Sequence, residues 1–259
     1  MKKRILLLLI SLFIITPAMP WGQTGHRAIG KIALNHLSKR AKKQLAAIMG
    51  HESLAIASTW MDEVRSDSTY DYMTDWHWVT IPDDQNYDTA EKNPNGDIIA
   101  TLERIIQELK TQKDTMPVEK QQEYIRILAH LVGDIHQPLH VGNGLDRGGN
   151  DTKVRWFWAT ETNLHSVWDS RIIAHKELSY TELAAAIDHT LKSDIEQWQR
   201  DSVRDWAKES MSYRKNVYNL PADNNLAYRY VFDNWDIVQL RIQQAGIRLA
   251  GVLNEIYGS

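Results

Sequence analysis

The sequence contains no cysteine, which limits the ways in which the fold can be held together. Disulfide bonds, a lipid attached to cysteine and metal sites built on thiolates are all excluded. Packing of the core and any bound metal must therefore supply the stability. With 259 residues, 43% of them hydrophobic, the chain is long enough to bury a large core.

Long apolar runs are absent after the first twenty residues. That first segment has a basic head at residues 2–4, an apolar run at 5–15 and the small-residue pair Pro17-Ala18 near its end. This order is typical of a signal peptide, and the apolar run is too short to cross a bilayer. We therefore expect residues 1–20 to be removed and the protein to be exported, either periplasmic or secreted, with no membrane anchor.

The end of the signal peptide leaves two possible starts for the mature chain. A small residue is expected immediately before the cut, and Pro20 does not fit that rule. Cleavage after Ala18 would leave Met19 and Pro20 ahead of Trp21. The mature chain therefore begins at Trp21 or at Met19.

An excess of basic residues is also absent. The formal net charge is −3, and loss of residues 1–20 removes three positive charges and no negative one, so the mature chain carries −6. This argues against binding nucleic acid through a broadly basic surface. It leaves open a site whose positive charge comes from metal ions. No linker or low-complexity tract interrupts residues 21–259, which we expect to form one domain.

Hydrophobic periodicity predicts a mainly α fold with little sheet. The helices are expected at 26–49, 53–65, 97–112, 118–136, 164–174, 180–198, 203–213 and 225–256. The aromatic and β-branched stretch 76–81 is typical of a strand, and 153–158 predicts a strand of a small β-hairpin. Four glycines among residues 142–151 indicate a loop.

The stretch from His130 to His140 carries the strongest signal of a metal site. His130 and Asp134 are four residues apart, so a helix stacks them on one face. Pro138 cannot continue the helix, and His140 follows just past its end. Two imidazoles and a carboxylate at a helix terminus are suitable zinc ligands. His136 points away from that face, and we interpret it as structural.

The same spacing occurs again at His165 and Asp169. Further ligand-competent side chains in plausible positions are His26, Asp62 and His77. This set is larger than one zinc ion needs, so we expect more than one ion. Nitrogen and oxygen ligands without thiolate indicate zinc in a hydrolytic role, and carboxylates can bridge paired metals.

Several blocks occur in the order found in one enzyme family. They are Trp21-Gly-x-x-Gly-His26, Trp60-Met-Asp62-x-x-Arg65, Trp76-His77, His130-x-x-x-Asp134-x-His-x-Pro-Leu-His140, Asp146-x-Gly-Gly-Asn150 and Asn163-Leu-His165-x-x-Trp-Asp169. The chain thereby resembles the zinc-dependent, single-strand-specific nucleases called nuclease type I, typified by the fungal S-one and P-one nucleases. The resemblance implies one multi-helix domain, of a fold shared with zinc-dependent phospholipase C, that holds three zinc ions in a cleft.

The resemblance also implies which residues bind each ion. The first zinc would be held by Asp62, His77, His130 and Asp134, the second by Asp134, His26 and the free amine and carbonyl of Trp21, and the third by His140, His165 and Asp169. Three zinc ions carry six positive charges, which would offset the acidic balance of the mature chain.

The implied activity is hydrolysis of phosphodiester bonds in single-stranded DNA and RNA, with removal of phosphate from 3′-nucleotides. A hydroxide held between the bridged metals would attack phosphorus and leave 5′-phosphorylated products. Asp62 would orient the attacking water and Arg65 would clamp the phosphate. Trp78 would stack on an unpaired base, and Asn150 would lie in the same cleft. We expect the enzyme to be a monomer.

Two alternatives follow from the same residues. Zinc-dependent phospholipase C carries glutamate at the position of Asp169 and a longer spacing between the first tryptophan and histidine, so both features favour the nuclease. A non-catalytic zinc-binding protein of the cell envelope would have no use for Arg65 beside Asp62. Thr80 stands where the fungal enzymes carry an aspartate near the base, so their base preference is not transferred.

Overall fold

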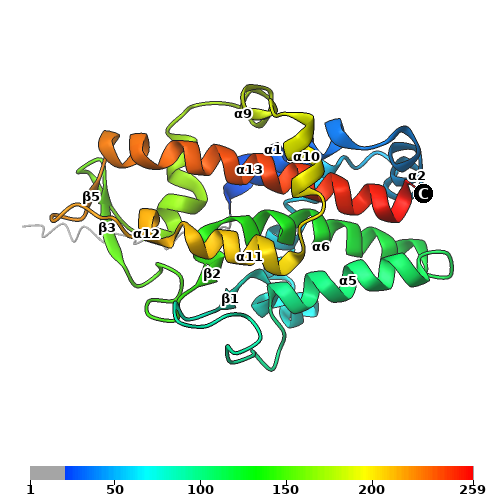
Figure 1. Ribbon diagram of the computed structural model, residues 1–259, viewed down its shortest axis with the longest axis horizontal. Helices are drawn as coiled ribbons and strands as arrows, with labels where there is room; N and C mark the ends of the chain where they lie inside the picture. The colour runs from blue at the N-terminus through cyan, green and yellow to red at the C-terminus, as the bar shows by residue number, and fades with distance from the viewer. Residues whose placement is uncertain (1–20, 259) are drawn as a thin grey trace, which may run out of the picture.

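The computed structural model describes residues 21–258, and within this range the fold is mainly α, as predicted. Figure 1 shows the helices α13, α6, α5 and α11 with their axes roughly aligned, and a small sheet at one end of the molecule. The predicted signal peptide at residues 1–20 lies outside the described residues. Among the described residues, no helix is long and apolar enough to cross a membrane.

The elements follow one another along the chain with few long loops. In the first half they are α1 (Gly22–His36), α2 (Lys39–Met49), α3 (Leu54–Ala57), α4 (Trp60–Glu63), η1 (Val64–Ser66), η2 (Ser68–His77), β1 (Val79–Thr80), α5 (Ile98–Gln112), α6 (Val118–His136), η3 (Pro138–His140) and β2 (Val141–Gly142). In the second half they are β3 (Lys153–Trp156), β4 (Thr160–Asn163), α7 (Leu164–Ser166), the π-helix η4 (Val167–Arg171), α8 (Ile172–Ala174), α9 (Tyr180–Ile187), α10 (Lys192–Trp198), α11 (Val203–Ser212), α12 (Arg214–Val217), β5 (Asn225–Leu226) and α13 (Tyr228–Tyr257).

Helix α6 lies at the centre of the core. Every residue from Ile127 to His140 is buried, so the second half of the helix and the turn after it have no solvent-facing side. The helix packs against α1, α5, α11 and α13. A helix that is covered all round is expected to be apolar all round. The buried His130 and Asp134 therefore break the pattern and mark the position of the site.

Several predicted helices are divided in the structure, including 53–65, which becomes α3, α4 and η1. The predicted helix 26–49 breaks after His36, because Leu37 is extended and the Ser38 side chain accepts a hydrogen bond from the Ala41 amide, capping α2. Asn254 Oδ1 also accepts from the Ser38 amide at 2.7 Å, which fixes the break from α13. The predicted helix 180–198 likewise divides, into α9 and α10. The apolar residues keep the spacing of a helix across both breaks, so the sequence pattern did not predict them.

The strand prediction for 76–81 is right only for its centre. His77 ends the 3₁₀-helix η2, and β1 contains two residues, which pair in parallel with β2 as Val79 with Val141 and Thr80 with Gly142. The hairpin prediction is confirmed, since β3 pairs antiparallel with β4. β5 adds to the other edge of β3 in parallel.

One buried arginine holds the β1–β2 pair in place. Arg214, at the start of α12, donates to the carbonyls of Val141 and Gly142 on β2 and to that of Ile81 just after β1. Its guanidinium also contacts Asp83 at 2.8 Å. Five donors in a fixed plane suit Arg214 to joining separate carbonyls. The two chain segments that carry His77 and His140 are thereby tied together.

Candidate metal centre

Three groups of histidine and carboxylate side chains lie together beside α6. Within each group all ligand-type atoms are within 4.8 Å of one another. The groups are His26–His130–Asp134, Asp62–His77–His130 and His140–His165–Asp169. The structure therefore brings together every histidine and carboxylate that the sequence predicted as a ligand. The first two groups share His130, so they adjoin.

Asp134 lies between the histidines of the adjoining groups. Its Oδ1 is 3.2 Å from His26 Nε2, while its Oδ2 is 2.9 Å from His77 Nδ1 and 3.2 Å from His130 Nε2. The carboxylate is fully buried. Burial opposes its charge, but the surrounding imidazoles hold the pKa of Asp134 well below its usual value. A carboxylate whose two oxygens face different histidines can bridge two cations.

Asp62, on α4, completes the group with His77 and His130. Its side chain is buried, Oδ1 is 4.0 Å from His130 Nε2, and Arg65 Nη2 lies 3.1 Å from the same oxygen. Burial raises the pKa of Asp62, opposed by the charges of His130 and Arg65. Burial also lowers the pKa of His77 to about 3, which keeps its imidazole neutral and able to bind metal.

The third group is organised around Asp169 in the π-helix η4. Asp169 Oδ1 lies 3.5 Å from His140 Nε2, and Oδ2 lies 3.0 Å from His165 Nε2. Gln137, inside the turn after α6, donates from Nε2 to Oδ1 at 2.6 Å. Burial opposes ionisation, but the charges and hydrogen bonds of His165 and His140 lower the pKa of Asp169 to about 2. The carboxylate is thus ionised and held in one orientation.

Backbone carbonyls orient three of the imidazoles. The Nδ1 atoms of His130, His140 and His165 donate to the carbonyls of Ser58, His77 and Gly148, each at 2.7 Å. The Nε2 lone pair of each ring is therefore turned toward its cluster. This outer arrangement is the usual one for metal-binding histidines.

Buried polar atoms without a hydrogen-bond partner gather at this centre. Across residues 21–258 they include both ring nitrogens of His26, both carboxylate oxygens of Asp62, Asp134 Oδ1, His140 Nε2 and Asp169 Oδ2. Leaving such groups unpaired costs free energy unless something else binds them. Nitrogen and carboxylate ligands without sulfur suit a hard or borderline divalent cation. The residues present therefore fit bound metal ions.

A glycine allows the second imidazole to approach. A Cβ on Gly133 would lie 2.8 Å from His26 Nδ1, closer than a side chain tolerates. Without it, the rings of His26 and His130 stack with centroids 4.1 Å apart. Glycine at this point of α6 is explained by the close packing of α1 on the cluster.

The metal groups open into a cavity of about 600 Å³, here called the site cavity. Its walls include the ligand candidates His77, His140 and His165 together with all three residues predicted to meet substrate, Arg65, Trp78 and Asn150. The Trp78 side chain is 40% exposed. Asn150 Nδ2 donates to the carbonyl of Arg147 within the glycine-rich loop. Metal ligands, a cation and an aromatic face thus share one opening.

The sequence is similar to known proteins over most of its length. The family model described as S1/P1 nuclease matches residues 21–258. The chain belongs to the S1/P1 nuclease family. Endonuclease 3 of Arabidopsis thaliana is 30% identical over 97% of this chain and 95% of its own length. Nuclease P1 of Penicillium citrinum is 27% identical over 92% of this chain and 98% of its own, and Nuclease S1 of Aspergillus oryzae 24% identical over 91% of each.

Membership of the S1/P1 family establishes the class of reaction. The protein is a hydrolytic, metal-dependent, single-strand-specific endonuclease, and nucleic acid is its substrate. The three His/Asp groups could hold that metal. The prediction of the family and of an enzyme is therefore confirmed.

The structure describes the surroundings of Trp21 but does not test its predicted role as a ligand. It is fully buried, it caps the start of α1, and its carbonyl accepts from the His26 amide at 3.3 Å. Its neighbour Pro20 is outside the described residues, so a free amine at Trp21 stays a prediction.

Some supporting residues of this S1/P1 centre were not predicted. Gln137, whose side chain orients Asp169, carries no pattern of its own, although its place between two motif histidines was a usable signal. The carbonyls of Ser58 and Gly148 have no side-chain signature at all. His136 was predicted as structural, and it lies away from the metal groups, where its Nε2 meets Arg248 at 2.9 Å.

Proposed function

We propose that the protein is a zinc-dependent endonuclease that hydrolyses single-stranded DNA and RNA to 5′-phosphorylated products. We propose that it also removes the phosphate of 3′-nucleotides. The observation that carries this proposal is the opening of three His/Asp groups into a cavity that also holds Arg65 and the exposed Trp78. A storage site would not need an aromatic face at that position.

Three zinc ions would occupy the three groups. The first would be held by Asp62, His77, His130 and Asp134, the second by Asp134, His26 and Trp21, and the third by His140, His165 and Asp169. When bound, zinc lowers the pKa of coordinated water toward neutrality and supplies positive charge to a phosphodiester. The presence of buried, unpaired nitrogen and carboxylate atoms at the centre supports this assignment.

The chain's own residues would bind and orient the substrate. Arg65, whose planar fork matches phosphate oxygens, would hold the scissile phosphate, and its contact with Asp62 keeps both groups on one side of the cavity. Asp62, with its raised pKa, would orient the attacking water and accept its proton. Trp78 would stack on a base, which is accessible only in an unpaired strand, and Asn150 would contact the nucleotide from the glycine-rich loop.

We also propose that residues 21–259 form one catalytic domain and that residues 1–20 direct export to the periplasm or the medium. The mature enzyme would be a monomer that begins at Trp21, because a free amine is a ligand and an amide nitrogen is not. Amino-terminal sequencing of the exported protein tests this point. A stable start at Met19 would contradict it.

The activity is tested by assays on single-stranded DNA, RNA, 3′-AMP and a phosphatidylcholine analogue, each with and without chelator. We expect hydrolysis of the first three, loss of it with chelator, and recovery with zinc. Metal analysis of the purified enzyme should give three zinc ions per chain. Hydrolysis of the lipid analogue alone would favour a phospholipase C, and zinc binding without any hydrolysis would favour a storage protein.

A further inference from the structure

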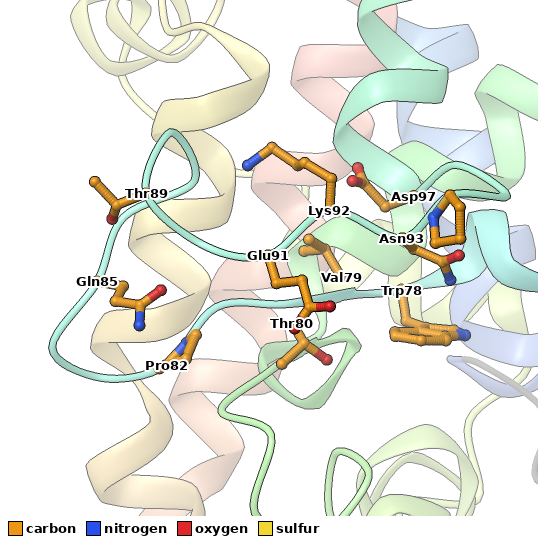
Figure 2. A pocket seen from close by; sticks show the side chains of 11 residues that line it. Trp78, Val79, Thr80, Pro82, Gln85, Thr89, Glu91, Lys92, Asn93 and Asp97 are labelled. Atoms are coloured by element: carbon orange, nitrogen blue, oxygen red, sulfur yellow. The ribbon is translucent and has the colours of Figure 1, made fainter.

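A second cavity lies next to the site cavity. It measures about 590 Å³ and is here called the side cavity. Trp78, Val79 and Thr80 line both cavities, so the segment that carries β1 forms their common wall. The opposite wall is the loop from Pro82 to Asp97, whose residues surround the space in Figure 2. Apart from Trp78, no residue that lines the side cavity has a role assigned above.

The lining of the side cavity combines apolar surface with polar edges. Pro82, Val79 and Pro94 supply the apolar part, and the side chains of Gln85 and Glu91 supply hydrogen-bonding groups. Neither of these two side chains makes a hydrogen bond within residues 21–258. An apolar surface beside an amide and a carboxylate that make no hydrogen bond suits a nucleobase and its polar edge.

The charges of the side cavity do not suit a phosphate. Among the described residues that line it, the cation is Lys92, whose Nζ donates to the carbonyls of Tyr87 and Ala90. Asp97 caps α5 through the amides of Ile99 and Ala100, each at 2.9 Å, and is buried. Glu91 remains as an exposed anion, which would repel a phosphate. The side cavity therefore favours the base over the backbone of a nucleotide.

Resting on the proposed function, we propose that the side cavity binds the base of the nucleotide next to the one held in the site cavity. Trp78 is exposed and lines both cavities, so a strand lying across it would have one nucleotide next to each cavity. Glu91 only accepts hydrogen bonds, so it selects bases with an exocyclic amino group, at N6 of adenine, N4 of cytosine or N2 of guanine, over thymine and uracil. Gln85 offers both a donor and an acceptor to the same edge.

The test compares deoxyadenosine and deoxythymidine homopolymers of equal length with Glu91→Gln and Gln85→Ala. Glu91→Gln keeps the size of the side chain but replaces one acceptor oxygen by a donor. We expect it to lower the dA-to-dT ratio of kcat/KM by about fivefold, the effect of one hydrogen bond. Gln85→Ala should raise KM for both homopolymers more than it changes hydrolysis of 3′-AMP, which spans one nucleotide. Gln107→Ala, a solvent-exposed glutamine of α5 outside both cavities, is the matched control.

Failure of this inference and failure of the proposed function give different results. If the wild type hydrolyses none of these substrates, the proposed function is wrong. The affinity for labelled homopolymers, measured by fluorescence anisotropy, then still tests the side cavity, because binding needs no turnover. If both variants bind and cleave the two homopolymers with the wild-type ratio and the wild-type KM, the side cavity is not a base-binding subsite.

Discussion

Two buried polar clusters lie on either side of α6, and they differ in how their atoms are paired. The metal cluster consists of the three His/Asp groups around Asp134 and Asp169. The arginine cluster consists of His136, Asp201, Glu209, Arg241 and Arg248. In the arginine cluster Glu209 Oε2 accepts from both Arg241 and Arg248 at 2.6 Å, and Asp201 accepts from Arg248 at 2.6 Å.

The two clusters show that burial of charge alone does not identify a functional site. Both contain histidine and carboxylate, and both touch the same helix at positions a few residues apart. His136 uses both ring nitrogens, donating from Nδ1 to the Val132 carbonyl and accepting at Nε2 from Arg248. His26 Nε2 lies 3.2 Å from Asp134 Oδ1, but neither ring nitrogen of His26 meets the geometry of a hydrogen bond within the described chain. Complete pairing indicates a structural role, and unpaired nitrogen and oxygen atoms indicate a site for a cation.

The largest effect is expected from Asp134→Asn, which keeps the shape but removes the charge between two metal groups. We expect loss of two of the three zinc ions and a fall in nuclease activity of more than about 100-fold, the upper end seen for outer-shell changes. Mass spectrometry of the native protein and a single-strand assay measure both. The control is His136→Ala, which should leave metal content unchanged. Equal metal losses in the two variants would remove the distinction between the clusters.

Glu209→Gln should produce the opposite result in the arginine cluster. It leaves the buried guanidiniums of Arg241 and Arg248 without their shared anion. Breaking a buried ion pair costs about 3–5 kcal/mol, and because the Glu209 side chain is 34% exposed we expect the lower end of that range. Urea unfolding measures the loss, while zinc content stays at the wild-type value.

The control for this variant is Glu196→Gln, which breaks the exposed pair with Lys192. Such a pair contributes at most about 1 kcal/mol. If Glu209→Gln lost zinc before it lost stability, the arginine cluster would be part of the metal site. If it lost neither zinc nor stability, the cluster would not be a structural element of the fold.

Gln137→Ala sharpens the comparison inside the metal cluster. Gln137 accepts from the Leu139 amide and donates to Asp169, so it is a satisfied group that orients a ligand. We expect a 10- to 100-fold lower affinity for one zinc ion, with the other two retained. Titration with chelator resolves the sites. Gln122→Ala, which removes a donor to the distant Ile48 carbonyl, should leave all three affinities unchanged.

Much of this organisation could be predicted from the sequence because it is local. The i, i+4 spacing of His130 and Asp134 needs only a helix, and the helix was found at its predicted bounds. The order of the motif blocks then identified every histidine and carboxylate of the three groups. Secondary structure was less accurate where a distant side chain decides it, as at the break fixed by Asn254.

The arginine cluster could not be predicted for the same reason. Arg241 and Arg248 are two turns apart on α13, and charged residues on an amphipathic helix normally face water. They are buried here because two carboxylates lie beside them. Glu209 on α11 pairs with Arg241, and Asp201, in the turn after α10, pairs with Arg248. Nothing in the spacing along the chain records that meeting. The side cavity shares this property, since its walls come from the contact of a loop with β1 rather than from a motif.

The smallest expected effect is a pH dependence that separates the two clusters. Burial raises the pKa of Glu209, but Arg248 and Arg241 lower it by a larger amount. The pKa of Glu209 in the folded state therefore lies below the usual 4.5. A lowered carboxyl pKa contributes stability that is complete above the unfolded value and is lost as pH falls below about 4.5. In chelator, the difference in unfolding free energy between wild type and Glu209→Gln should therefore be larger at pH 6 than at pH 3.5. A difference that stayed constant would mean that Glu209 does not act through its charge, and the pairing that distinguishes the arginine cluster would then not stabilise the fold.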